Sequence, residues 1–217
     1  MEKRKQIDIF WAKPSYKERL EYEVKIDISA RHVHLSEEDA TILFGKGYEL
    51  TEKKKIAVGA LAKERVTLVG PKKKIENVGI LLPFRKQTQV ELSMTDTYAL
   101  GIQAPIRLSG DISGSAPIKI VGPAGELQLQ EGVIVAKRHV HIGPNLAKRY
   151  GLTTESSVRV AVKTPQRSIV FDDVNVRISK PGKNEEIPNV HLDTDEGNAA
   201  GIHGSEMGTL LIDYRSN

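Results

Sequence analysis

The sequence contains two copies of one unit, and this internal repeat restricts the possible folds more than any other feature. Residues 24–51 read VKIDISARHVHLSEEDATILFGKGYELT, and residues 132–160 read GVIVAKRHVHIGPNLAKRYGLTTESSVRV. Each copy has an apolar strand-like run, then Arg-His-Val-His, then a helix-like segment, then Gly and a return to strand-like sequence. The repeat predicts two halves with related folds.

Most of the remaining sequence alternates apolar with polar residues in short runs, which is the period-two pattern of half-buried strands. Gly70–Pro71 and Gly122–Pro123 predict turns between such runs. Three segments favour short helices, and they are residues 36–45, residues 144–152 and, more weakly, residues 195–201. We therefore expect a mainly β protein with short α helices, built as two β-barrel-like domains of related fold.

We expect residues 1–21 to form an N-terminal extension, residues 22–136 a first barrel domain and residues 137–217 a second. The extension contains Pro14, many charges and weak periodicity, which leaves a short helix open. It also lacks the apolar core of a secretory signal. Because the chain has no cysteine, disulfides and thiolate ligands are excluded, and an intracellular, cytoplasmic location fits.

The net charge of +4 is spread along the chain, with local basic runs at residues 53–55 and 72–74. The lysines of these runs are either simply solvated, or they create a mild positive field that attracts a phosphorylated ligand. Aromatic residues make up only 5% of the chain, and no dense basic stripe is present, so we expect no nucleic-acid partner. No apolar run approaches the roughly 20 residues that span a bilayer, so we expect no membrane partner.

Four of the six histidines form two His-Val-His triplets, His32 with His34 and His139 with His141. In an extended segment, residues two positions apart point to the same face, so each triplet presents two imidazoles to one metal ion. A single triplet is often an incidental exposed strand, but two in matching positions of a repeat favour metal binding. Imidazole ligands suit zinc.

Four imidazoles cannot complete two metal spheres, so further ligands are expected. His191 lies in a strand-like run and is a candidate, although a lone histidine is often structural. Glu91 lies on a predicted strand and is either a ligand or part of an exposed face. The competing carboxylates are Asp193, Asp195 and Glu196.

Two further features bear on phosphate chemistry. Arg85 lies six residues before Glu91, and a guanidinium binds phosphate oxygens in a fork. The Gly-rich stretch Ser109–Ser115 is either a phosphate-cradling loop or a flexible connection. The arginines that precede the two His-Val-His triplets are not assigned to catalysis. The chain has no Gly-x-Ser-x-Gly, His-Glu-x-x-His or dinucleotide-binding motif.

Five motifs occur in order and with consistent spacing from about residue 22 onward. They are ISARHVHLS, RKQTQVE, RLSGD, EGVIVAKRHVH and HLDTDEGNAA. Together they resemble the PduL family of phosphate acyltransferases. The resemblance implies two barrel-like β domains capped by short helices, with the N-terminal strand, residues 22–30, completing the second barrel.

The resemblance also implies a dinuclear zinc centre, with two Zn²⁺ ions per chain. One ion would be held by His32, His34 and Glu91, and the other by His139, His141 and His191, with Glu91 near enough to bridge. Arg85 matches the phosphate-handling arginine of the family, and the positions of Ser109 and Asn198 line the same pocket.

The implied reaction is reversible transfer of a short acyl group, propanoyl or acetyl, between coenzyme A and inorganic phosphate. Both substrates would be bound together, because no residue is an obvious acyl-carrying nucleophile. Two rival functions remain, a dinuclear zinc hydrolase acting on a phosphate ester or amide and a non-catalytic, metal-stabilised scaffold module.

The family resemblance raises two further questions about partners. Members sent to bacterial microcompartments, as in propanediol utilization, carry an amphipathic targeting helix, whereas residues 1–21 contain Pro14 and no clean apolar face. Shell association is therefore not supported by a clear targeting helix. Acyl chain preference and the oligomeric state, a homo-oligomer included, stay open.

Overall fold

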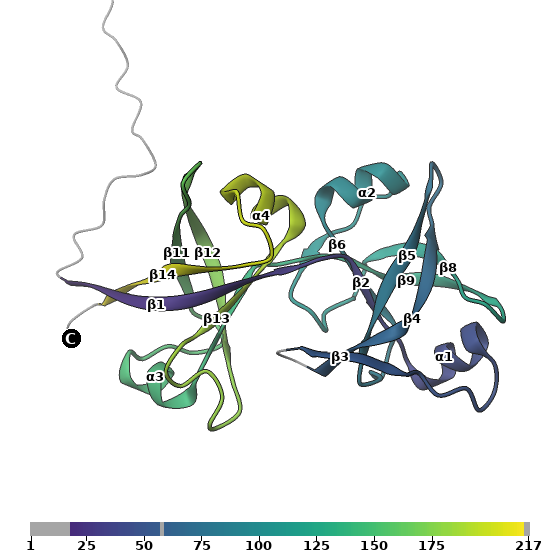
Figure 1. Ribbon diagram of the computed structural model, residues 1–217, viewed down its shortest axis with the longest axis horizontal. Helices are drawn as coiled ribbons and strands as arrows, with labels where there is room; N and C mark the ends of the chain where they lie inside the picture. Colours follow the sequence, from purple (N-terminus) through teal and green to yellow (C-terminus); the bar gives the residue numbers. More distant parts are fainter. Residues whose placement is uncertain (1–17, 57–58, 215–217) are drawn as a thin grey trace, which may run out of the picture.

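The computed structural model describes residues 18–56 and 59–214, which are mostly strands with a few short helices. The strands form two closed barrels that lie side by side, each with short helices at its ends (Figure 1). The expected fold class is confirmed. Among the described residues, no helix has the length and apolar character needed to cross a membrane.

The second barrel contains six strands in the closed order β1-β13-β10-β12-β11-β14. Its strands are β1 (Glu18–Ser29), β10 (His139–Ile142), β11 (Ser157–Lys163), β12 (Ser168–Ile178), β13 (Asn189–Asp193) and β14 (Ser205–Tyr214). Its helices are α3 (Pro144–Arg149) and α4 (Thr194–Ala200). The interior is an apolar cluster that includes Val24, Val140, Val160 and Val190.

The first barrel closes because β8 pairs with both β4 and β9, which gives the ring β4-β5-β2-β6-β9-β8. Its strands are β2 (His32–His34), β4 (Gly59–Val69), β5 (Lys74–Leu82), β6 (Gln89–Leu92), β8 (Ala116–Val121) and β9 (Glu126–Ala136). The short strands β3 (Glu52–Ile56) and β7 (Ile106–Arg107) extend the sheet beyond the ring. The helices are α1 (Glu37–Phe44) and α2 (Met94–Leu100).

The two rings have the same pattern of strand pairing. In the first barrel, β2 is parallel to β5 and antiparallel to β6, while β6 is parallel to β9. In the second, β10 is parallel to β12 and antiparallel to β13, while β13 is parallel to β1. The repeat seen in the sequence therefore corresponds to two copies of one topology.

The chain passes from one barrel to the other directly before each Arg-His-Val-His copy. Strand β1 precedes β2 in the sequence but pairs with β13 and β14 of the second barrel. Strand β9 precedes β10 but pairs with β6 and β8 of the first barrel. Figure 1 shows β1 running from the second barrel to the centre of the molecule, where β2 begins. Both histidine pairs therefore start at the junction between the barrels.

The helices begin and end where capping chemistry dictates. The Ser36 side chain accepts a hydrogen bond from the N–H of Asp39 at the start of α1, and Pro144 begins α3. Helix α4 occupies the weaker third segment predicted from the sequence. Helix α2 was not predicted, although it repeats the design of α4, with a capping box at its start and a left-handed glycine at its end.

One local expectation needs correction, the short helix left open for residues 1–21. Strand β1 begins at Glu18, so any helix in the extension excludes residues 18–21. Residues 1–17 lie outside the described residues.

The two Gly-Pro turns pack tightly against helix ends. Two residues after Gly70, the N–H of Lys72 donates to the Leu100 carbonyl of α2. Two residues after Gly122, the N–H of Ala124 donates to the Leu43 carbonyl of α1. Each turn therefore satisfies a carbonyl that the last turn of its helix leaves open.

Replacing Gly122 by alanine is expected to lower the free energy of unfolding by about 2 kcal/mol. A Cβ atom there would lie 2.4 Å from the Leu43 carbonyl oxygen, so backbone must shift. Gly47→Ala is the control, because φ is +78° and nothing lies within 4 Å of its Cβ, which leaves about 1 kcal/mol of backbone strain. Urea unfolding of both variants measures the difference. A Gly122→Ala variant as stable as Gly47→Ala would contradict the prediction.

Candidate metal centre

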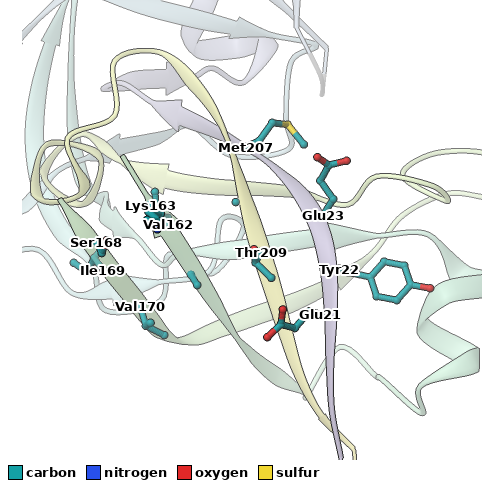
Figure 2. Close-up of a pocket in the computed structure, with 12 residues that line it drawn as sticks. Glu21, Tyr22, Glu23, Val162, Lys163, Ser168, Ile169, Val170, Met207 and Thr209 are labelled. Atoms are coloured by element: carbon teal, nitrogen blue, oxygen red, sulfur yellow. The ribbon is translucent and has the colours of Figure 1, made fainter. Parts of the chain in front are cut away.

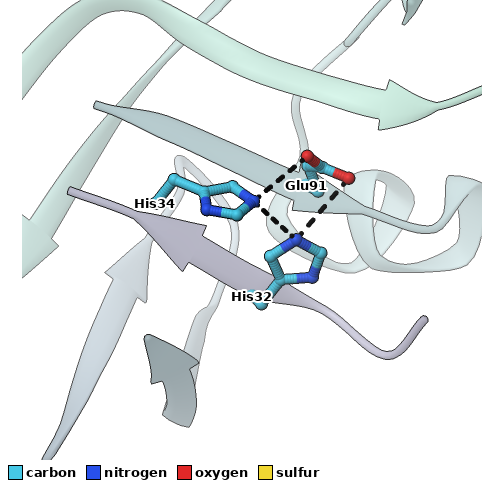
Figure 3. Close-up of side chains that lie close together, drawn as sticks. All are labelled: His32, His34 and Glu91. Atoms are coloured by element: carbon cyan, nitrogen blue, oxygen red, sulfur yellow. Dashed lines mark hydrogen bonds and ion pairs between the residues drawn. The ribbon is translucent and has the colours of Figure 1, made fainter. Parts of the chain in front are cut away.

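The first barrel brings His32, His34 and Glu91 together. Strands β2 and β6 are antiparallel neighbours, and their register places Glu91 directly opposite His32. Glu91 Oε2 lies 3.6 Å from His32 Nε2, and Oε1 lies 3.5 Å from His34 Nε2 (Figure 3). Within residues 18–56 and 59–214, this is the group of three whose candidate ligand atoms all lie within 4.8 Å of one another.

All three side chains of this group are buried, and the two Nε2 atoms are 3.2 Å apart. Two imidazoles and one carboxylate are a common donor set for zinc, and three protein ligands leave a coordination position open for a substrate. The valine between the histidines, Val33, is fully buried in the core, as the alternation of a strand predicts.

The second barrel brings His139, His141 and His191 together in the equivalent positions. Strands β10 and β13 are antiparallel, and His191 lies opposite His139. The ring centroids are 5.0 Å apart for His139 and His141, 5.2 Å for His139 and His191, and 5.2 Å for His141 and His191. Three adjacent imidazoles again form a zinc-type donor set, although this trio is less compact than the first.

Main-chain carbonyls orient the first histidine of each pair. The Nδ1 atom of His32 lies 2.9 Å from the carbonyl oxygen of Ala30, and the Nδ1 atom of His139 lies 3.0 Å from that of Lys137. A protonated Nδ1 that donates to a carbonyl leaves the Nε2 lone pair for a metal ion. The sequence repeat therefore includes the groups that orient the histidines.

Four of the candidate imidazoles are in the form that binds metal at neutral pH. Burial lowers the pKa of His139 to about 3 and that of His141 to about 4. Burial also lowers the pKa values of His34 and His191. A neutral imidazole offers the lone pair that coordination requires, so no proton must be lost first.

A hydrogen-bond network holds Glu91 in its charged form. Burial alone would raise its pKa, but the neighbouring His32 and His34 side chains and the hydrogen bond from Ser109 hold the pKa well below its usual value. The Ser109 hydroxyl donates to Oε1 at 2.5 Å, and Gln89 Nε2 donates to the same oxygen at 2.6 Å. Gln89 was not singled out from the sequence, although it lies two residues before Glu91 on the same face of β6.

Arg85 reaches this network from the loop between β5 and β6. Its Nη1 donates to the Ser109 hydroxyl at 2.9 Å and lies 4.0 Å from Glu91 Oε1. The guanidinium is only partly exposed, and burial lowers its pKa while Glu91 raises it. Arg85, Ser109 and the first metal candidates therefore form one continuous site.

In the glycine-rich stretch Ser109–Ser115, most backbone N–H groups donate to other groups of the protein. The N–H groups of Gly110 and Gly114 donate to the side chains of Gln89 and Glu131. The N–H groups of Asp111 and Ser115 donate to main-chain carbonyls. Ser109 lies in the site, but the following backbone is not an open phosphate cradle.

Asn198 lies on α4, where its side chain is exposed and forms no hydrogen bond with the described residues. The three competing carboxylates also have other partners. Asp193 and Glu196 form the capping box of α4. Asp195 accepts a hydrogen bond from the N–H of Thr95 on α2. None of these three belongs to the compact three-ligand group.

The arginines of the two Arg-His-Val-His copies brace the helices. Arg31 forms two contacts with Asp96, at 3.0 and 2.9 Å, and Asp96 is the third residue of α2. Arg138 contacts Glu196 at 2.8 Å, in the equivalent place on α4. Their carboxylate partners lie on the helices and are not metal candidates, so a structural role explains why both arginines recur in the repeat.

Two polar groups near His191 were also missed. Asn189 is buried opposite His141, and its Nδ2 lies 3.0 Å from Asp27 Oδ2 and 3.3 Å from His191 Nε2. Arg177 lies opposite His141 on the parallel neighbour β12, and its Nη2 donates to the Ser109 carbonyl at 2.6 Å. Both depend on strand pairings that no local sequence pattern reveals.

The Arg177 contact connects the second barrel to the Glu91 network. Charges also act across the junction, because Glu91 and His32 both influence the pKa of His191. The two groups of metal candidates therefore lie near one another at the junction between the barrels.

A cavity of about 770 Å³ lies elsewhere, on the second barrel between β1, β11, β12 and β14 (Figure 2). Its lining includes the exposed residues Glu21, Glu23 and Lys163, and it contains none of the metal candidates. This cavity is distinct from the candidate metal centre.

Comparison with known proteins identifies the family of the chain. The sequence model of the phosphate propanoyltransferase family matches residues 25–203. Curated phosphate propanoyltransferases from Thermotoga maritima and Lachnoclostridium phytofermentans are 46% and 47% identical to the chain. These alignments cover 87% and 88% of this chain, and 89% and 88% of the relatives.

A curated phosphate propanoyltransferase from Citrobacter koseri is 40% identical, over 91% of this chain and 93% of the relative. The family match spans both barrels and includes all six metal candidates and Arg85. The chain therefore belongs to the phosphate propanoyltransferase family and is an acyltransferase.

Proposed function

We propose that this protein transfers a short acyl group, propanoyl or acetyl, reversibly between coenzyme A and inorganic phosphate at a dinuclear zinc site. The observation that carries the proposal is the convergence of two equivalent ligand trios and Arg85 at the junction of the barrels. The names of the family and its curated relatives support acyl transfer to phosphate. The division at residues 136 and 137 would then place one ligand trio on each half.

The donor sets fit zinc. His32, His34 and Glu91 would hold one ion, with Nε2 atoms oriented and a charged carboxylate in place. His139, His141 and His191 would hold the second, with neutral imidazoles. Bound zinc supplies Lewis acidity, which stabilises negative charge on a thioester oxygen and on a departing thiolate.

The residues of the chain would bind and orient the second substrate. Arg85 would bind phosphate oxygens, because its Nε and Nη2 form no hydrogen bond with the described residues. Ser109 lies between Arg85 and Glu91 and would keep the guanidinium beside the metal site. Asn198 would contact coenzyme A from α4. Holding both substrates in line accounts for rate by positioning, without an acyl-enzyme.

The test is an assay of coenzyme A release from propanoyl-CoA and acetyl-CoA, with and without phosphate. We expect release to require phosphate and to yield acyl phosphate in equal amount. A zinc hydrolase would release coenzyme A without phosphate or would cleave a generic phosphoester. A scaffold module would bind zinc and show no turnover. Mass spectrometry after mixing with acyl-CoA alone checks direct transfer, because an acylated Ser or Thr would contradict it.

A further inference from the structure

Arg177 is a partly buried cation without a carboxylate partner among the described residues. It is the residue of β12 that lies opposite His141. Burial lowers its pKa, while Glu91 raises it. Of its three guanidinium nitrogens, Nη2 donates to the Ser109 carbonyl, and Nε and Nη1 form no hydrogen bond within residues 18–56 and 59–214. These two nitrogens are therefore available to donate to an anion.

Arg177 and Arg85 approach the same residue from different barrels. Arg85 Nη1 contacts the Ser109 hydroxyl at 2.9 Å, and Arg177 Nη2 contacts the Ser109 carbonyl at 2.6 Å. The two guanidinium groups are close enough for the charge of Arg177 to lower the pKa of Arg85. This accumulation of positive charge favours a multivalent anion at the junction.

We propose that Arg177 is a second phosphate-binding arginine, which together with Arg85 holds the inorganic phosphate or the phosphoryl group of the acyl phosphate. This inference rests on the function proposed above. Two guanidinium groups from opposite sides can each donate to a different oxygen of one phosphate, which fixes its orientation as well as its place. The site would then require both barrels, because each supplies one arginine.

The phosphate groups of coenzyme A have the same chemistry, so the experiment must separate the two sources. Arg177→Gln removes the charge and keeps a polar side chain, and Arg177→Lys keeps the charge without the planar fork. KM for phosphate, KM for acyl-CoA, kcat and zinc content are measured for each variant. Calorimetry with inorganic phosphate and the zinc-loaded protein gives Kd without turnover.

For Arg177→Gln we expect KM and Kd for phosphate to rise by about tenfold or more, with KM for acyl-CoA and zinc content unchanged. Arg177→Lys should show a smaller rise in both constants. Arg65→Gln is the matched control, because Arg65 also donates to main-chain carbonyls, those of Ala62, Lys63 and Glu64, and should keep the wild-type constants.

An unchanged phosphate Kd in both variants would overturn the proposal, and a rise in KM for acyl-CoA alone would place a coenzyme A phosphate there instead. A rise in both KM values together with lower zinc content and lower thermal stability would show that Arg177 only holds the Ser109 loop in place. If the wild-type protein shows no phosphate-dependent turnover, the proposed function fails, and the phosphate Kd still decides whether Arg177 binds phosphate.

Discussion

Replacing Glu91 by glutamine is expected to lower the zinc content and to reduce phosphate-dependent turnover by about a thousandfold or more. The amide has nearly the same shape as the carboxylate, but it lacks the negative charge with which Glu91 would bind a zinc ion. Glu91 is buried, lies opposite His32 and receives hydrogen bonds from Gln89 and Ser109. Elemental analysis and an assay of coenzyme A release measure the two effects.

The matched control is Glu64→Gln in the same barrel. Glu64 accepts hydrogen bonds from the Tyr48 hydroxyl and the Thr51 N–H, so it is structural and lies outside the ligand trio. This variant should keep its zinc and its turnover. Normal zinc content and activity in Glu91→Gln would remove Glu91 from the metal site.

Replacing Arg85 by alanine is expected to reduce kcat/KM for phosphate by about 100- to 1,000-fold and to leave the zinc content intact. The guanidinium contacts Ser109 and lies beside Glu91, but it offers no lone pair to a metal ion. Losing it removes a cation from the position where phosphate would be oriented. Steady-state kinetics with varied phosphate and metal analysis of the same sample check both parts.

Lys86→Ala is the control for Arg85, because it removes an exposed cation from the next position in the loop. Its turnover should stay near the wild-type level, which separates a specific contact from a general loss of positive charge. Zinc loss in Arg85→Ala would show that Arg85 supports the metal site and does not chiefly handle phosphate.

Local patterns in the sequence predicted several residues of the candidate site. Two residues that are adjacent on one face of a strand must project together, so the spacing of His32 and His34 already implied a shared ligand position. The repeat then extended that conclusion to His139 and His141. The structure places both pairs in strands and the intervening valines in the cores. Side-chain directions within one strand can be predicted from the sequence, because they depend only on neighbouring residues in the chain.

Helix α2 was not predicted, although a comparison within the sequence could have revealed it. Residues 92–102 read LSMTDTYALGI, and residues 192–202 read LDTDEGNAAGI. Both segments have a capping side chain before the helix (Ser93 and Asp193), an acidic third residue and a terminal glycine. Weak helix propensity hid α2, while comparison with the segment of α4 reveals it.

Other functional positions depend on pairings between distant strands. Glu91 faces His32 only because β6 lies antiparallel to β2 in one register, and a shift by one residue would turn the carboxylate to the other face. Gln89, Asn189 and Arg177 lie beside the histidines for the same reason. No spacing along the chain gives those registers.

By itself, the sequence determined that the chain forms two related β halves, each with a histidine pair on a strand and a helix after it. It did so because apolar alternation, caps and repeats act over a few residues. No local pattern places β1 and β9 each in the barrel opposite to the histidine pair that it precedes, although the family resemblance implied this for β1, and the tertiary structure shows it for both. At each crossing, one strand helps to close the ring of one barrel, and the histidine pair that follows it enters the other barrel. The two trios, Arg85 and Arg177 therefore lie near the junction between the barrels.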